Sequence, residues 1–131
     1  MRLDTGLLLL RFAAAGTMFF AHGLGKLSGF AAFSNSFPDP LGMGSTVTMA
    51  VAIFSEVICS ALVLVGWSAR LATLPLIGTM ATAFLIVHAS DPWKSKEPAF
   101  IYLCLFTCIW LMGPGSFSLD GLFKLNRVKR P

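Results

Sequence analysis

Four long apolar stretches, separated by short polar segments, constrain this chain more than any other feature of its sequence. The stretches cover about residues 6–27, 46–67, 71–88 and 97–113. A helix that crosses a bilayer needs about 20 mostly apolar residues, and each stretch is close to that length. Only 12% of the 131 residues are charged, about half the share that is usual in a soluble domain. The sequence therefore predicts an all-α membrane protein, a single domain built as a bundle of four transmembrane helices.

The segments between the stretches carry residues that end helices. Residues 29–45 are rich in proline and glycine and are expected to form a long loop. Residues 89–98 are expected to form a second loop, and Gly113-Pro114-Gly115 ends the last stretch. The first stretch has the leucine run of a secretory signal, but Arg11 interrupts it, so we expect a retained helix.

The distribution of cations predicts the orientation in the membrane. An even number of spans puts both termini on one face, with six cations: Arg2, Arg70, Lys124, Arg127, Lys129 and Arg130. The opposite face has three: Lys26, Lys94 and Lys96. Cytoplasmic segments are enriched in lysine and arginine. Both termini, including the basic tail 124–131, are therefore expected in the cytoplasm.

Charge and cysteine content exclude several functions. The net charge of +4 comes largely from the tail, so it indicates membrane topology, and no nucleic-acid partner is expected. No second, soluble domain fits in the chain, which excludes a nucleotide-binding α/β enzyme. Cys104 and Cys108 are four residues apart on one predicted helix, a poor geometry for a disulfide. No set of cysteines has metal-ligand spacing, so no metal site is expected.

Two ionisable residues inside the apolar stretches need an explanation. Arg11 is in the first stretch and Glu56 in the second. A charged side chain at the centre of a membrane helix costs about 2.5 to 3.5 kcal/mol on insertion scales, and buried charges are normally paired. We therefore expect an Arg11–Glu56 ion pair, which at its simplest holds two helices in register.

A stripe of cations follows one face of the first predicted helix. Arg11 and His22 are 11 residues apart, about three turns, and Lys26 follows one turn later. This face is expected to point into the bundle, where it needs anions nearby. The sequence therefore predicts a polar funnel on the outer side, formed by His22, Lys26, His88 and Glu97 above a deeper Glu56 and Arg11.

The two histidines of the funnel allow three interpretations. Each could simply hydrogen-bond to a loop carbonyl at a helix end. They could exchange protons, since histidine titrates near neutral pH. They could also be paired axial ligands of a haem between the first and third helices. A haem is disfavoured because the sequence has no second histidine pair and no covalent attachment motif.

Several short motifs, taken in order, resemble the DoxX family of small bacterial membrane proteins with four helices. The motifs are Arg11, Gly16, His22-Gly23-Leu24-Gly25-Lys26, Glu56 with Gly66 downstream, Arg70-Leu71-Ala72, Val87-His88, Glu97, Gly113-Pro114-Gly115 and Leu119-Asp120. The resemblance extends from about Leu8 to Leu122. Where the family commonly has a Gly-Gly pair after the glutamate, this chain has Cys59-Ser60, which still permit close helix packing.

The resemblance implies a role in redox chemistry at the inner membrane of a bacterium. DoxX-like proteins are related to the membrane subunit of an archaeal thiosulfate:quinone oxidoreductase. We therefore expect a membrane subunit of an oxidoreductase system that binds a quinone, or a small oxidised or anionic ligand, in the funnel. The candidate catalytic residues are His22 and His88, which would exchange protons, and Glu56, which would relay them inward. The candidate ligand-binding residues are Arg11, Lys26, Arg70 and Glu97.

Two other functions fit the same sequence. The protein could be a membrane scaffold or assembly factor for a redox enzyme complex, in which the buried charges only hold the bundle together. It could also be a small-molecule carrier, for which a chain of 131 residues would need to form a homo-oligomer. All three functions predict contact with the lipid bilayer. The oxidoreductase subunit and the scaffold also predict a redox enzyme as partner.

Overall fold

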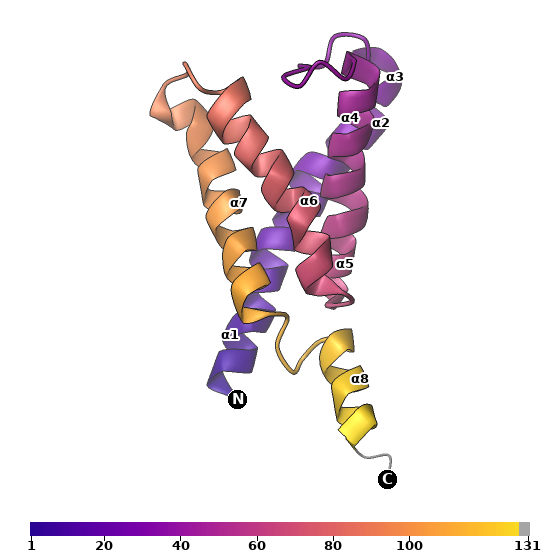
Figure 1. Ribbon diagram of the computed structural model, residues 1–131, viewed down its shortest axis with the longest axis vertical. Coiled ribbons are helices and arrows are strands. Elements are labelled where there is room, and N and C mark those ends of the chain that lie inside the picture. Colours follow the sequence, from indigo (N-terminus) through magenta and orange to yellow (C-terminus); the bar gives the residue numbers. More distant parts are fainter. Residues whose placement is uncertain (129–131) are drawn as a thin grey trace.

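The computed structural model describes residues 1–128, and helices are the only regular elements in that part of the chain. Four helical segments are long and apolar enough to cross a membrane: Arg2–Ser28, Ser45–Val65, Ala69–Val87 and Trp93–Met112. They run alternately up and down as one bundle (Figure 1). The predicted fold, an all-α membrane protein with four spans, is confirmed.

The first three spans each combine α-helix with wider π-helical segments. The first span consists of α1 (Arg2–Arg11), η1 (Phe12–Gly16), η2 (Met18–Gly23) and α2 (Leu24–Ser28). The second consists of α4 (Ser45–Ile53), η3 (Phe54–Cys59) and α5 (Ser60–Val65), and the third of α6 (Ala69–Thr82) and η4 (Ala83–Val87). The fourth is α7 (Trp93–Met112). Two short helices that the sequence analysis did not predict are α3 (Phe30–Phe33) and α8 (Leu119–Val128).

The two ends of the bundle differ in what they carry. One end, which we call the loop end, carries residues 29–44 and 88–92 between the spans. The other, which we call the terminal end, carries both Met1 and α8 (Figure 1). This arrangement agrees with four spans. That the terminal end faces the cytoplasm stays a prediction.

The fourth span is longer than its apolar stretch indicates, because its first turn is polar. α7 begins at Trp93, so Lys94 and Glu97 belong to the helix and the predicted loop 89–98 is shorter than expected. The Trp93 ring packs against Phe84 of the third span, with ring centroids 6.3 Å apart. This contact ties the polar first turn to the bundle.

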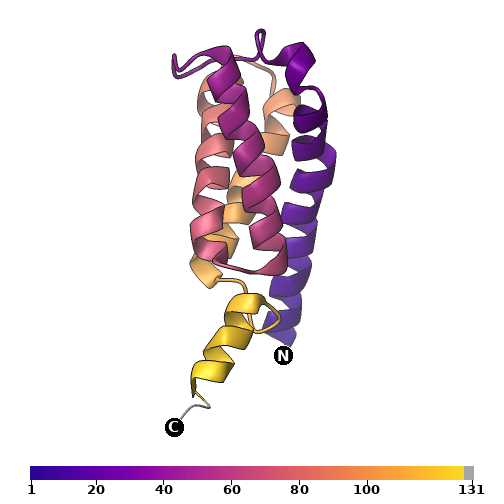
Figure 2. The ribbon, with the colours of Figure 1, turned by 90° about the vertical axis from the view of Figure 1, so that its right-hand side faces the viewer.

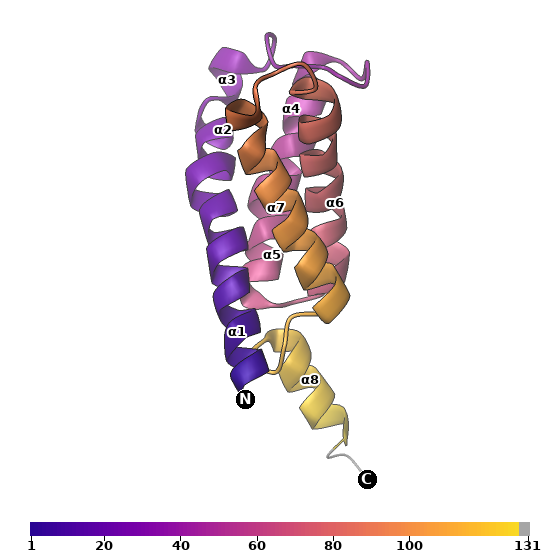
Figure 3. The ribbon, with the colours of Figure 1, turned by 90° about the vertical axis from the view of Figure 1, so that its left-hand side faces the viewer.

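The packed core lies in the half of the bundle nearer the terminal end. Ala14 and Ala15 of the first span are fully buried, and their small side chains allow close helix approach. Val63, Leu76 and Phe106 fill the space between the other spans. Figure 2 views the bundle with the second span in front, and Figure 3 with the fourth. Towards the loop end α4 and α6 diverge (Figure 1).

Candidate functional site

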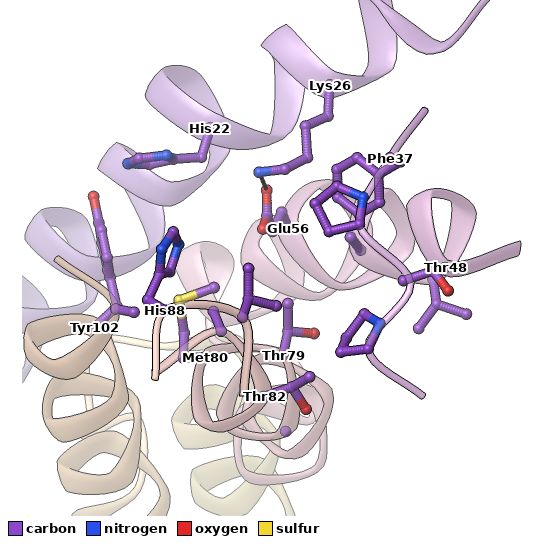
Figure 4. Close-up of a pocket in the computed structure, with 18 of the residues that line it drawn as sticks. His22, Lys26, Phe37, Thr48, Glu56, Thr79, Met80, Thr82, His88 and Tyr102 are labelled. Carbon is purple, nitrogen blue, oxygen red and sulfur yellow. Dashed lines mark hydrogen bonds and ion pairs between the residues drawn. The ribbon is translucent and has the colours of Figure 1, made fainter. Parts of the chain in front are cut away.

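A cavity of about 680 Å³ lies between the spans at the loop end (Figure 4). All four spans contribute to its walls, and residues 37–43 of the loop line it as well. Most of the lining is apolar. Small-molecule sites typically enclose about 300–1,000 Å³ and combine apolar walls with a few polar groups. The cavity is therefore the candidate functional site.

An ion pair between Lys26 and Glu56 lies on the cavity wall. The Nζ atom of Lys26 donates to Oε2 of Glu56 at 2.6 Å. The Glu56 side chain is 3% exposed and the Lys26 side chain 28%, so the lysine reaches a buried carboxylate (Figure 4). Lys26 is thus the partner of Glu56, and the predicted Arg11–Glu56 ion pair is wrong.

Close packing of two helices fixes the position of Glu56. Gly23 in η2 lies against the Glu56 backbone in η3: a Cβ atom at Gly23 would lie 2.6 Å from the Glu56 carbonyl oxygen. The Ser60 hydroxyl donates to the same carbonyl oxygen. π-Helical segments are frequent at functional sites, and His22 lies in η2 as Glu56 lies in η3. Lys26, one turn after His22, reaches the carboxylate from α2.

His22 and His88 both line the cavity, and each has a partner of its own. The His22 ring meets the Tyr102 ring edge-on, with centroids 5.4 Å apart, and the Tyr102 hydroxyl donates to Thr17 at 3.0 Å. His88 directly follows η4, and its Nδ1 atom lies 2.7 Å from Oδ2 of Asp91. The two imidazole rings therefore contact a tyrosine ring and an aspartate carboxylate, respectively.

A carboxylate in the loop holds residues 37–43 against the cavity. Asp39 accepts hydrogen bonds from the Thr48 hydroxyl at 2.8 Å and from the N–H groups of Gly44 and Met43 at 2.8 and 3.0 Å. The Thr48 hydroxyl and these N–H groups hold the pKa of the Asp39 carboxyl below its usual range. We call this arrangement the Asp39 clasp.

The other three predicted ligand-binding residues lie outside the cavity lining. Arg11 is at the terminal end, is 2% exposed, and donates from Nη2 to the Phe117 carbonyl oxygen at 2.7 Å. Arg70 is exposed at the same end and donates to the last turn of α7. Glu97 is exposed near the start of α7. Of the four predicted ligand-binding residues, Lys26 alone lines the cavity.

Arg11 belongs to a set of contacts that attaches residues 113–121 to the bundle, which we call the C-terminal clasp. Asp120 accepts hydrogen bonds at 2.9 and 3.0 Å from backbone N–H groups at the start of α6, which have no partner within the helix. Gly66, with φ 74°, leaves room for Arg11: a Cβ atom there would lie 2.2 Å from Nη1. The aspartate of the Leu-Asp motif therefore has a structural role, because it caps the start of α6.

Comparison with known proteins identifies the family. A DoxX family model matches residues 6–89. The chain belongs to the DoxX family. It is also similar to a protein of Haemophilus influenzae described as uncharacterized, with 31% identity over 126 residues that cover 90% of this chain and 83% of that protein. No solved structure matches the chain. The matched residues 6–89 include both histidines and the Lys26–Glu56 pair, whereas Tyr102 lies beyond them.

Three parts of the site of this DoxX-family protein were not predicted from its sequence: Tyr102, Thr79 and residues 37–43. Tyr102 carried a usable signal, because it is the single tyrosine of the chain and a tyrosine inside an apolar span needs a hydrogen-bond partner. Thr79 lies 3.0 Å from the Ser55 hydroxyl, a contact between two spans that no local pattern reveals. Residues 37–43 looked like an ordinary loop.

An apolar layer separates the cavity of this DoxX-family protein from Arg11. Ala14, Cys59, Val63 and Leu76 are buried there in one hydrophobic cluster. The inward relay from Glu56 stays a prediction. Within residues 1–128, no three His, Cys, Asp or Glu side chains are grouped so as to hold a metal ion.

Proposed function

We propose that this protein is the membrane subunit of an oxidoreductase system and binds a quinone in the loop-end cavity. The observation that carries the proposal is the Lys26–Glu56 ion pair on the wall of a cavity that is otherwise mostly apolar. An apolar cavity suits the ring of a quinone, and a few convergent polar groups suit its two carbonyl oxygens. The resemblance of DoxX proteins to the membrane subunit of a quinone-linked oxidoreductase supplies the redox context.

Charge balance favours a neutral ligand over an anion. Glu56 neutralises Lys26 at 2.6 Å, and Asp91 accompanies His88 at 2.7 Å. The arginines that would have made the site basic lie at the terminal end. An anion would lose its hydration on entering an apolar cavity and would meet a nearly neutral set of side chains there. This argues against the small anionic ligand that the sequence left open.

Lys26 is best placed to hold a carbonyl oxygen of the ring. Its ammonium group has three N–H donors and gives one to Glu56. The remaining donors are available to a ligand in the cavity. Glu56 acts through Lys26, because its carboxylate orients the ammonium group, so we assign it a positioning role. The Tyr102 hydroxyl and the His22 ring add polar groups elsewhere on the wall.

The histidines are the proposed proton donors. Reduction of a quinone to a quinol takes two electrons and two protons. His22 and His88 line the cavity and belong to the residue type that exchanges protons near neutral pH. His88 and Asp91 are both partly exposed at the loop end, so water can resupply protons there. The electrons come, in this proposal, from a partner redox enzyme.

We further propose that the protein lies in the inner membrane of a bacterium with its terminal end in the cytoplasm. The six cations of that face against three on the other support this orientation. The cavity then opens towards the outer side of the membrane. One chain supplies the whole lining of the cavity, so the site does not require a homo-oligomer.

The proposal is tested by the quinone content of the purified protein. Wild-type protein and variants are purified in mild detergent, and the organic extract is analysed by chromatography with ultraviolet detection. We expect stoichiometric quinone with wild-type protein and a large loss with Lys26→Met, because the variant lacks the donor to the carbonyl oxygen. Lys94→Met removes an exposed cation outside the cavity and is the matched control, expected to retain the wild-type amount.

Two other results would contradict the proposal. The first is an extract without quinone combined with variants, Lys26→Met and His22→Gln, that function fully in cells. This result would favour the scaffold, in which the ion pair only joins two spans. A Soret band that disappears in both His22→Ala and His88→Ala would identify a haem instead.

A further inference from the structure

We infer that the ligand enters the cavity sideways from the bilayer, through a lateral slot between α4 and α6, and that it is a lipid-soluble molecule whose apolar tail lies in that slot. The lateral slot is formed by Val51 on α4 and by Gly78 and Thr82 on α6, all of which line the cavity. The inference rests on the proposed function and adds the route and the class of ligand.

The walls of the lateral slot face both the cavity and the outside of the bundle. Val51 lines the cavity although 48% of its surface is exposed, and Gly78 is exposed as well. Gly78 lies nine residues from the end of the third span at Val87, about 14 Å along the helix. At this depth the medium outside the bundle is lipid. Residues that line the cavity and also face lipid mark an opening to the bilayer.

The opening exists because α4 and α6 pack against different partners. α4 contacts α2, and α6 contacts α7, whereas α4 and α6 make no extensive contact within residues 1–128. One turn deeper than Val51, the hydroxyls of Ser55 and Thr79 lie 3.0 Å apart and form the floor of the slot. A Cβ atom at Gly78 would meet no atom within 4 Å, so no side chain fills the opening there.

Two other sides of the cavity are bridged. On the loop side, residues 37–43 line the cavity and are held by the hydrogen bond from Thr48 to Asp39 at 2.8 Å. Between the first and fourth spans, the Tyr102 hydroxyl donates to Thr17 at 3.0 Å. In the part of the chain that the structure describes, the lateral slot has no comparable bridge above its floor. The membrane is therefore the least obstructed source of a ligand.

The side chains suit a ligand with a polar head and an apolar tail. Figure 4 shows His22, His88 and Tyr102 on one side of the cavity and Thr48 on the other, with the Lys26–Glu56 pair between them. A polar head that lies among the first three residues and reaches Lys26 leaves the tail directed towards α4 and α6. A ligand dissolved in water would need no such slot, so its presence favours molecules dissolved in the membrane.

The test fills the lateral slot from each wall in turn. Gly78→Phe and Val51→Phe add bulk to α6 and α4. Gly6→Phe is the matched control, because Gly6 is exposed on the first span and its Cβ would also meet no atom within 4 Å. Binding of a quinone with a long isoprenoid tail and of its tail-free analogue is measured in lipid nanodiscs by quenching of tryptophan fluorescence. Thermal unfolding in detergent identifies the variants that fold as wild type.

Both slot variants should bind the long-tailed quinone about tenfold more weakly, the loss expected when about two methylene groups lose their burial. Their binding of the tail-free analogue, and the binding of both quinones by Gly6→Phe, should match wild type. If both slot variants bind the long-tailed quinone as tightly as the wild-type protein does, the slot is wrong and the quinone site stands. The same conclusion follows if normally folded variants lose affinity for both quinones equally. Failure of the wild-type protein to bind the tail-free analogue would overturn the proposed function, and the slot with it.

Discussion

Lys26 and Glu56 form an ion pair between the first and second spans, with Nζ and Oε2 2.6 Å apart. The other cation buried in the first span, Arg11, is held instead by the Phe117 carbonyl oxygen at the terminal end. Two positive charges on one helix therefore have separate tasks. One completes the wall of the cavity, and the other anchors the C-terminal clasp.

A double-mutant cycle should separate these two tasks. Breaking a buried ion pair costs about 3 to 5 kcal/mol, and because Lys26 is partly exposed we expect about 3 kcal/mol for Lys26→Met. Adding Glu56→Leu should restore part of that loss, whereas Arg11→Met and Glu56→Leu should be additive. The measurement is the free energy of unfolding in detergent. Coupling of Glu56 to Arg11 and not to Lys26 would reverse the assignment.

The close helix crossing at Gly23 should tolerate no side chain. Gly23→Ala places a Cβ 2.6 Å from the Glu56 carbonyl oxygen, so we expect a destabilisation of about 1 to 3 kcal/mol from overpacking and loss of bound quinone. Gly25→Ala is the matched control, because no atom lies within 4 Å of its Cβ. Unfolding free energies of the two variants provide the comparison, and equal effects would show that this crossing does not fix the site.

The Asp39 clasp should open only in acid. The lowered pKa of Asp39 means that its ionised form stabilises the folded loop. This stabilisation is complete above the ordinary aspartate pKa, about 3.9, and is lost as the pH falls through the lowered value. A spin label at Leu41 should therefore report a fixed loop between about pH 5 and 8 and increasing mobility below about pH 4. Asp39→Asn should mobilise the loop throughout, and a mobile wild-type loop at neutral pH would contradict the clasp.

The C-terminal clasp should stabilise the terminal end without affecting the cavity. Asp120→Ala leaves the N–H groups at the start of α6 without their carboxylate, a loss of about 0.5 to 2 kcal/mol for caps of this kind. Limited proteolysis between residues 113 and 121 should become faster, while quinone content stays unchanged. Lys124→Ala alters an exposed residue of the same segment and should do neither. Loss of quinone in Asp120→Ala would connect the two ends of the bundle after all.

The spans could be predicted from sequence because lipid demands long apolar helices, and the chain supplies four. The partners of the charges could not. Side-chain charges alone predict an Arg11–Glu56 pair, whereas the Arg11 guanidinium group donates to a backbone carbonyl 106 positions later in the chain. Lys26 looked like a residue at the loop end, yet it reaches inward to Glu56.

The cavity itself depends on helix directions that no local pattern encodes. The sequence predicted a polar funnel, and His22, Lys26, Glu56 and His88 do line one cavity. Its mostly apolar walls and its opening between α4 and α6 follow from how the spans diverge. Glu97 lies in the first turns of α7 on an exposed face outside the cavity lining, a position that depends on how α7 packs and that its place in the sequence did not reveal.

Photolabelling tests most directly whether a quinone occupies the loop-end cavity. An azidoquinone is illuminated with the protein in native membranes, and the labelled peptides are mapped by mass spectrometry. Our account predicts label within residues 22–26, 37–43 or 78–88, displaced by unlabelled quinone and reduced in Lys26→Met but not in Lys94→Met. Label confined to the exposed face of α7 around Trp110, or label that unlabelled quinone does not displace, would contradict it.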